Sequence, residues 1–230
     1  MNETDTERPE FFSQFGQDYW LMNAAFPTMR NGYFVEVGAF QFANGYMSNT
    51  LALETRHNWR GLLIEPNPAL CGPLAAREST LVRAVVSDTR RTARFQFGDR
   101  GCNSMVVKNG GAEVVTETLT EILDRENAPR EIPFLSIDVE GHEMEVLRGI
   151  DFERYRFGCI IVEANGRDNA MARFLGERGY RYLDRLGVDL YFVGGGFAPA
   201  KPSEVVPEWG SFSNRAFPIA GGPWVENPIA

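Results

Sequence analysis

The segment Tyr33-Phe34-Val35-Glu36-Val37-Gly38 is the clearest indication of the fold, because it is an apolar run with one acidic residue and a terminal glycine. Aromatic and β-branched side chains favour a strand, and the glycine favours a tight turn directly after it. Residues 61–65 repeat this pattern, and residues 47–57 between the two runs have the composition of a helix. A strand, a helix and a second strand in this order predict the unit of a parallel sheet.

The alternation of strand-like and helix-like runs continues along the chain. We expect further strands at residues 81–86, 133–138 and 159–163, with helices at residues 68–77, 118–127, 141–148 and 169–178. The last two strands, residues 180–183 and 189–193, are joined by a connection too short for a helical crossover, which predicts an antiparallel pair. The sequence therefore predicts an α/β fold with a seven-stranded, mostly parallel sheet, helices on both faces and an antiparallel terminal hairpin.

Three segments depart from this alternation. Residues 1–30 are expected to form an N-terminal cover segment, in which residues 15–26 are aromatic and helical and Pro27 ends the helix. Within the main domain, residues 31–193, the stretch 93–115 contains two short β-like runs separated by glycines, which we interpret as an insertion or an edge hairpin. Residues 194–230 are rich in Gly and Pro, which predicts an irregular C-terminal tail.

The composition is that of one folded domain. With 230 residues, 43% of them hydrophobic, the chain is long enough to bury a core. It has no run of about 18 apolar residues and no signal-peptide pattern at its N-terminus, so we expect no membrane segment and a cytoplasmic location. The net charge of −8 argues against a nucleic-acid partner. Three widely spaced cysteines indicate neither a disulfide framework nor a cysteine metal site.

Acidic and polar side chains stand where the predicted strands end. These ends are residues 36–39, 65–67, 87–88, 138–143 and 163–165. In open α/β sheets, ligands bind beyond the carboxyl ends of the strands. An acidic group at every end suits a ligand that carries a cation and several hydroxyl groups.

The turn after the first strand narrows the class of ligand. Gly38 lets the backbone approach a ligand closely, and Glu36 is placed to attract an ammonium group directly or through water. A dinucleotide-binding turn requires the pattern G-x-G-x-x-G, which residues 38–43 lack. Glu65, at the end of the next strand, is placed to accept hydrogen bonds from a ribose diol. An ordinary tight turn and a solvated carboxylate are the alternative interpretations of these two strand ends.

The stretch Asp138-Val139-Glu140-Gly141-His142-Glu143 carries the candidate chemistry. Asp138 emerges at the end of the fourth strand and His142 follows at the start of a helix, so each is a candidate general base. A position on the helix surface is the alternative role for His142. Glu140 and Glu143 also fit the first helical turn, where carboxylates interact favourably with the helix dipole.

Several stretches taken together resemble the FkbM family of methyltransferases. They are residues 13–18, 34–39, 48–54, 59–68, 86–88 and 138–149, and the blocks at 64–68 and 138–143 are the most specific. The resemblance covers roughly residues 13–193, and the tail from Gly194 lies outside it. It implies the Rossmann-like fold of class I methyltransferases, which also ends in an antiparallel hairpin. It further implies S-adenosylmethionine as the methyl donor, a molecule with a sulfonium, an ammonium and a ribose diol.

The resemblance and the strand ends together give the predicted site. The helix from Gln14 would cover the cofactor, and the predicted cofactor-binding residues are Gln14, Glu36, Gly38, Ala39, Ser48, Glu65, Pro66, Ser87, Asp88 and Asp138. The predicted catalytic residues are Asp138, His142 and Glu163. Because the family does not always have histidine at the position of His142, that residue has less catalytic weight than Asp138.

The implied reaction is O-methylation of a hydroxyl on a small natural product or sugar, and two mechanisms are open. In the first, Asp138 or His142 acts as the general base. In the second, a divalent cation such as Mg²⁺, bound by Asp138, Glu163 and Asn165, lowers the pKa of the acceptor hydroxyl. Turn formation by Asn165-Gly166 is the alternative interpretation of the last strand end.

Two other classes of function remain as alternatives. One is a nicotinamide-dependent oxidoreductase on a similar sheet, against which the missing glycine pattern and the closing hairpin count. The other is a non-catalytic cofactor-binding subunit that uses the tail as a partner surface. Four large aromatic residues of the tail, Trp209, Phe212, Phe217 and Trp224, also suggest a homo-oligomer.

The identity of the acceptor, a small molecule or a glycan, is not encoded in any motif. We expect acceptor specificity to lie in the cover segment and in residues 93–115. Six aromatic residues near the predicted site fit packing better than stacking on a ligand: Phe11, Phe12, Tyr19, Trp20, Phe40 and Phe42.

Overall fold

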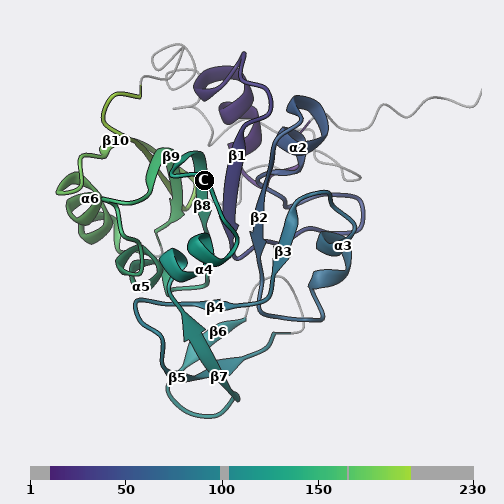
Figure 1. Cartoon of the computed structure of the whole chain (residues 1–230), viewed down its shortest axis with the longest axis vertical. Helices are drawn as coiled ribbons and strands as arrows, with labels where there is room; N and C mark the ends of the chain where they lie inside the picture. Colours follow the sequence, from purple (N-terminus) through teal and green to yellow (C-terminus); the bar gives the residue numbers. More distant parts are fainter. Residues whose placement is uncertain (1–10, 99–103, 165, 198–230) are drawn as a thin grey trace, which may run out of the picture.

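The computed structural model describes residues 11–98, 104–164 and 166–197 and shows a main sheet between two layers of helices, with a smaller sheet beside it (Figure 1). The main sheet has seven strands in the order β10-β11-β9-β8-β1-β2-β3. They are β1 (Tyr33–Val37), β2 (Arg60–Ile64), β3 (Thr80–Val82), β8 (Glu131–Ile137), β9 (Arg156–Glu163), β10 (Arg181–Leu186) and β11 (Asp189–Val193). The predicted seven-stranded, mostly parallel sheet is confirmed.

The pairing of the strands determines which residues leave the sheet together. β1 pairs in parallel with β2 and β8, and Val37 lies opposite both Ile64 and Ile137. The carboxyl ends of these three strands are therefore level. β9 continues the parallel order beside β8, whereas β11 runs antiparallel to both β9 and β10. The predicted terminal hairpin is confirmed, and it places Asp189 opposite Glu163.

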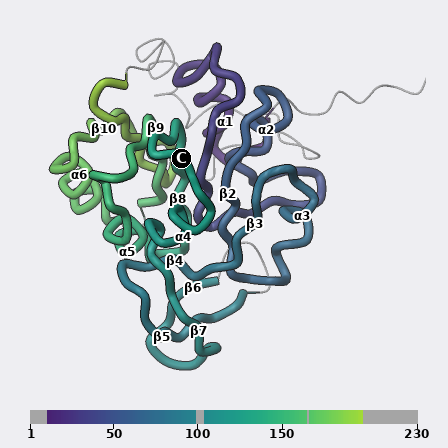
Figure 2. Tube along the Cα trace, in the orientation of Figure 1, coloured from purple at the N-terminus to yellow at the C-terminus, as the bar shows by residue number. Residues whose placement is uncertain are grey.

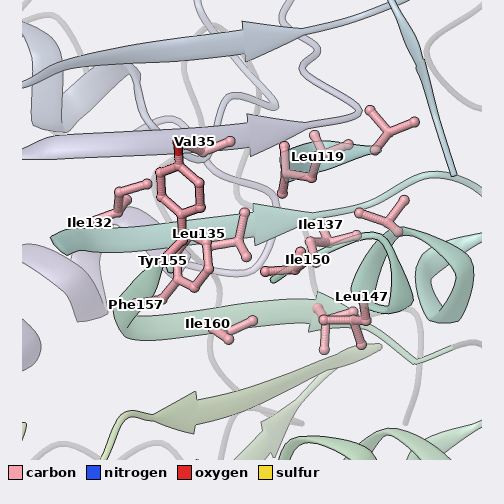
Figure 3. Close-up of a cluster of buried hydrophobic side chains, with 14 of the residues drawn as sticks. Val35, Leu119, Ile132, Leu135, Ile137, Leu147, Ile150, Tyr155, Phe157 and Ile160 are labelled. Atoms are coloured by element: carbon pink, nitrogen blue, oxygen red, sulfur yellow. The ribbon is translucent and has the colours of Figure 1, made fainter. Parts of the chain in front are cut away.

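One face of the sheet packs against three helices. Val35, Leu135 and Ile160 are paired neighbours on β1, β8 and β9, and Figure 3 shows them beside Leu119 and Leu147 of the helices. These helices are α4 (Leu119–Arg125), α5 (Glu143–Arg148) and α6 (Asp168–Gly176). Burial of each such side chain contributes about 1.5–3 kcal/mol, so this face holds much of the stability of the fold.

The other face packs against the N-terminal half of the chain. Phe34 and Phe134 point to this face and are buried with Trp20, Leu53 and Leu74. The helices that supply these partners are α1 (Gln17–Trp20), the π-helix η1 (Leu21–Ala25), α2 (Leu51–His57) and α3 (Cys71–Ala75). Helix formation at residues 15–26 is thus confirmed, although the second half is a π-helix. No helix in the described ranges is long and apolar enough to span a membrane.

The predicted strand 81–86 is wrong as a single element. β3 ends at Val82. The Val82 carbonyl accepts the last hydrogen bond between the two chain segments, from the N–H of Glu65 directly after β2, at 3.0 Å. The chain then turns away, and β4 (Val85–Val86) pairs with a different sheet. The strand breaks here because β2 has no further residues for it to pair with.

The second sheet has the order β4-β7-β5-β6 and is larger than the insertion predicted from the sequence. It comprises β4, β5 (Thr92–Gln96), β6 (Met105–Val107) and β7 (Ala112–Glu117), and the prediction lacked β7. Figure 2 traces the chain from β3 through this sheet and back to α4. The small sheet is therefore an excursion between two elements of the main domain.

Candidate functional site

The turn after β1 is held against the end of β8. Gly38 has φ of +82°, and a Cβ atom at this position would lie 1.6 Å from the carbonyl oxygen of Asp138. Gly38 N–H donates to the Ile64 carbonyl at 2.9 Å, and Asp138 N–H donates to the Val37 carbonyl at 2.9 Å. Only glycine fits this close approach, which brings the first and fourth predicted strand ends together.

A pocket of about 500 Å³, including space open to solvent, lies at these strand ends. Five of the predicted site residues line it: Gly38, Glu65, Pro66, Asp138 and His142. Ala84, Val85 and Val86 line it from the β3–β4 segment, and Phe95, Ser104 and Val106 line it from the small sheet. The parallel strands thus converge on one pocket, as ligand binding at their carboxyl ends requires.

Glu65 is a buried carboxylate with spare hydrogen-bonding capacity. It is 5% exposed, and its Oε1 accepts from the Asn67 N–H at 2.6 Å. This is the sole hydrogen bond to its carboxylate within the described ranges. Burial raises the pKa of Glu65 to about 7, and the Asn67 N–H opposes this shift. A carboxylate with one oxygen left to accept, facing a pocket, matches the donors of a ribose diol.

Glu36 and Ser48 lie in a buried network rather than on the pocket wall. The Arg77 guanidinium, whose side chain is 3% exposed, donates to Ser48 Oγ at 3.1 Å and to Glu54 Oε2 at 3.1 Å. It lies 3.9 Å from Glu36 Oε2, which also accepts from Thr50. Burial raises the pKa of Glu36, and Arg77 opposes the shift.

Arg77 is a residue that the sequence analysis missed. It lies just beyond α3, next to the β1–α2 connection, and contacts residues of β1, of that connection and of α2. Nothing in the local sequence around Arg77 distinguishes it from a surface arginine. Its partners are far along the chain, so only the fold shows that its charge is buried and paired.

Ser87, Asp88 and His142 form a hydrogen-bonded chain beside the pocket. Ser87 Oγ lies 3.0 Å from His142 Nε2 and 3.0 Å from Asp88 Oδ1. Arg91 donates to Asp88, and this hydrogen bond lowers the pKa of Asp88. Partial burial lowers the pKa of His142, with Glu145 opposing, so burial favours the neutral imidazole. Of these three, only His142 lines the pocket itself.

The turn after β8 is built around Glu143. Glu140 and Gly141 both have positive φ, at +57° and +93°. Glu143, which is fully buried, accepts from the Gly141 N–H at 2.7 Å and from the Val139 N–H at 3.3 Å. The carboxylate accepts from N–H groups that bond no backbone carbonyl in this tight turn. It therefore fixes the path of the chain directly after Asp138.

Asp138 stands among other carboxyl groups at the edge of the sheet. Asp138 is exposed on the pocket wall, and desolvation by the walls around it, together with the charges of Glu163, Asp189, Glu140 and Glu143, raises its pKa above the ordinary value. Glu163 ends β9 and does not line the pocket, and Asp189 is its cross-strand neighbour on β11. The like charges disfavour ionisation, so this end of the site retains a proton more readily than an isolated aspartate does.

Asp189 connects this end of the site to the cover segment and was also missed. It is 5% exposed, and Gln17 Nε2 of α1 donates to its Oδ2 at 2.6 Å. Burial raises the pKa of Asp189 to about 7, which Gln17 opposes. Asp18 then holds the start of the segment by accepting from Ser13 and from the Phe12 N–H.

Other predicted residues lie away from the pocket. Gln14 is exposed at the start of the cover segment, and Ala39 is buried in the core below the turn. The aromatic residues divide: Phe12 and Trp20 are packed, whereas Tyr19 and Phe42 are 37% and 51% exposed. Asn165 and the tail beyond residue 197 lie outside the described residues.

The described residues contain no group of three or more His, Cys, Asp or Glu side chains arranged to hold a metal ion. The predicted set of Asp138, Glu163 and Asn165 includes one residue outside the described ranges. The groups that line the pocket, a carboxylate that can accept from a diol and a glycine turn, fit S-adenosylmethionine.

Comparison with known proteins agrees with this geometry. The profile of the methyltransferase FkbM domain family matches residues 36–182, which is more than half of the chain and runs from the end of β1 to the start of β10. Searches of curated proteins and of solved structures found no match. The sheet order with its closing hairpin is that of class I methyltransferases. The chain belongs to the FkbM family of methyltransferases, enzymes that use S-adenosylmethionine as the methyl donor.

Proposed function

We propose that this methyltransferase methylates a hydroxyl group of a small natural product or sugar, with Asp138 as the general base. The observation that carries the proposal is the position of Asp138, on the pocket wall directly against the Gly38 turn. An aliphatic hydroxyl is a poor nucleophile unless its proton is leaving. A raised pKa makes the ionised carboxylate a stronger base toward that proton.

The residues divide the work between the two ends of the pocket. Glu65 accepts hydrogen bonds from the ribose hydroxyls, and the Gly38 turn lets the backbone approach the bound cofactor closely. S-adenosylmethionine supplies a methyl group bound to a sulfonium, and the carbon of this methyl group is the electrophile. Asp138 takes the proton of the acceptor hydroxyl, and the turn fixed by Glu143 holds Asp138 in position. Much of the rate of methyl transfer therefore comes from the orientation of the reacting groups.

His142 is the second candidate for the base. Its Nε2 already lies 3.0 Å from Ser87 Oγ, and its Nδ1 lies 3.7 Å from Glu145. Nε2 is therefore already within hydrogen-bonding distance of Ser87, although Nδ1 lies beyond hydrogen-bonding distance of Glu145, whereas Asp138 lines the pocket among repelling carboxyl groups. This difference supports Asp138 over His142.

Ligand binding tests the cofactor half of the proposal. S-adenosylhomocysteine is expected to raise the melting temperature of the protein, and NADH is expected to leave it unchanged. Glu65→Gln should reduce the shift, with Glu113→Gln as the matched control because Glu113 is 67% exposed on β7. Stabilisation by NADH alone would support the oxidoreductase alternative instead.

Turnover tests the catalytic half. A panel of hydroxylated natural products and free sugars is screened for S-adenosylhomocysteine formation, and Asp138→Asn is compared with Asp184→Asn on the edge strand β10. We expect Asp138→Asn to lower turnover by about 10²-fold or more while S-adenosylhomocysteine still binds. Unchanged turnover in Asp138→Asn would contradict the proposed base. Loss of activity in EDTA with recovery in Mg²⁺ would favour the metal mechanism.

A further inference from the structure

We propose that the hairpin of β5 and β6 is the wall of the cofactor pocket that faces the nucleoside half of S-adenosylmethionine, and that Asn67 fixes this wall to the end of β2. The inference rests on the proposed role of Glu65 as the acceptor for the ribose hydroxyls. It gives a cofactor role to part of residues 93–115, the segment for which the sequence predicts acceptor specificity.

Asn67 uses every polar group it has. It is 2% exposed; its N–H donates to Glu65 Oε1 at 2.6 Å, and its Oδ1 accepts from the Ala69 N–H at 3.0 Å. Its Nδ2 donates to the Gly98 carbonyl at 2.8 Å and to Ser104 Oγ at 3.0 Å. The side chain of Asn67 therefore connects two parts of the site. One is the turn that orients Glu65, and the other is the pair of segments that follow β5 and precede β6.

Ser104 completes the link. Its Oγ accepts from the Gly98 N–H at 3.1 Å as well as from Asn67. Gln96 and Met105, the last paired residues of β5 and β6, lie next to this cluster. The polar cluster thus fixes the hairpin at the end nearest the pocket.

The hairpin residues that line the pocket are mainly apolar. Phe95 and Val106 are cross-strand partners, and both line the pocket together with Pro66 and Val85. Apolar surfaces accept the face of a purine, and a nearby carboxylate accepts the ribose hydroxyls. Asn67 holds the carboxylate and the apolar wall next to each other, which is the arrangement that a nucleoside requires.

The acceptor side of the site has a different anchor. Gln17 connects the cover segment to Asp189, which is the cross-strand neighbour of Glu163. The hairpin, in contrast, is connected to the turn after β2. The two coverings therefore serve opposite ends of the site, and the hairpin serves the end that carries Glu65.

Two variants test the link by different routes. Asn67→Asp keeps the shape of the side chain but replaces the donor to Gly98 and Ser104 with an acceptor. Ser104→Ala removes the hairpin side of the link without a change of charge. Asn127→Asp is the matched control, because Asn127 is exposed and its side chain donates to the Arg125 carbonyl.

Calorimetry with S-adenosylhomocysteine and with adenosine gives the decisive values. We expect the Kd of both ligands to rise about ten-fold in Asn67→Asp and in Ser104→Ala, and to stay unchanged in Asn127→Asp. An equal loss for both ligands locates the effect at the nucleoside, which is common to them. Faster hydrogen exchange at β5 and β6 amides in the same two variants would show that the wall has loosened.

Wild-type Kd values for both ligands, together with faster exchange in the hairpin, would overturn the inference. If Asn67→Asp fails to fold, Ser104→Ala decides the question by the same two measurements. If the wild-type protein binds neither ligand, the proposed cofactor site fails as well, so the two failures are distinguishable.

Discussion

Glu65 shows how a single buried carboxylate links cofactor binding to pH. Its folded pKa of about 7 lies above the ordinary value of 4.5, so its ionised fraction grows as the pH rises from 6 to 8. The ribose hydroxyls donate best to the ionised form, so the affinity for S-adenosylhomocysteine should rise over this range. Glu65→Gln should weaken binding about ten-fold at pH 8 and should remove most of the pH dependence. Calorimetry of both proteins at pH 6, 7 and 8 measures this, and equal slopes would contradict it.

Gly38 allows a sharper comparison between two glycines. Gly38→Ala would place its Cβ 1.6 Å from the Asp138 carbonyl oxygen, so we expect a loss of more than about 4 kcal/mol in the free energy of unfolding.

Gly141 is the matched control for this change. Its φ is +93°, but a Cβ there would meet nothing within 4 Å. Gly141→Ala should therefore cost only the backbone term of about 1–2 kcal/mol. Urea unfolding of both variants gives the values, and similar losses would show that the contact with Asp138 relaxes.

At the scale of elements, Arg77 joins β1, the β1–α2 connection and α2. Arg77→Met would leave Glu36 and Glu54 buried without their partner cation, which should lower the free energy of unfolding by about 3–5 kcal/mol. Arg60→Met, which removes an exposed ion pair with Glu78, should cost less than about 1 kcal/mol. Equal losses in urea unfolding would mean that the buried network contributes no more than a surface pair.

The elements also show what the sequence can and cannot predict. The strand ends at Gly38, Glu65 and Asp138 were predictable, because an apolar run followed by glycine or a carboxylate is a local pattern. The split between β3 and β4 was not, since it depends on where the partner strand β2 ends. Arg77 and Asp189 were missed for a related reason: their partners lie far along the chain, and burial of a charge leaves no local signal.

The site was predictable in the same partial way. Glu65, Pro66, Gly38, Asp138 and His142 reach the pocket because each follows directly from a strand end or its turn. Glu36 points to the α2 face of the sheet instead, since alternation along β1 sends it to the side of Phe34. A sequence pattern identifies the strand end but leaves the partner of each side chain open.

At the scale of the whole molecule, the two sheets should unfold together. β4 connects the two parts, because its backbone pairs with β7 of the small sheet while Val86 is buried in the main core. α4, which follows β7, packs into the main core through Leu119, Ile122 and Leu123. We expect circular dichroism and tryptophan fluorescence to give one common urea midpoint. An earlier loss of dichroism alone would show that the small sheet opens independently.

The attachment of the cover segment has a consequence for protein engineering. Its described part contains the helices α1 and η1 and is held mainly by side chains: Gln17 on Asp189, Asp18 on the preceding backbone, and Trp20 in edge contact with Tyr191. A graft of this segment from another family member need not preserve any backbone ladder, provided that it keeps an amide for Asp189 and an aromatic ring for Tyr191. Because the sequence predicts acceptor specificity in this segment, we expect such a graft to exchange acceptor scope while the Glu65 and Asn67 end of the enzyme stays as it is.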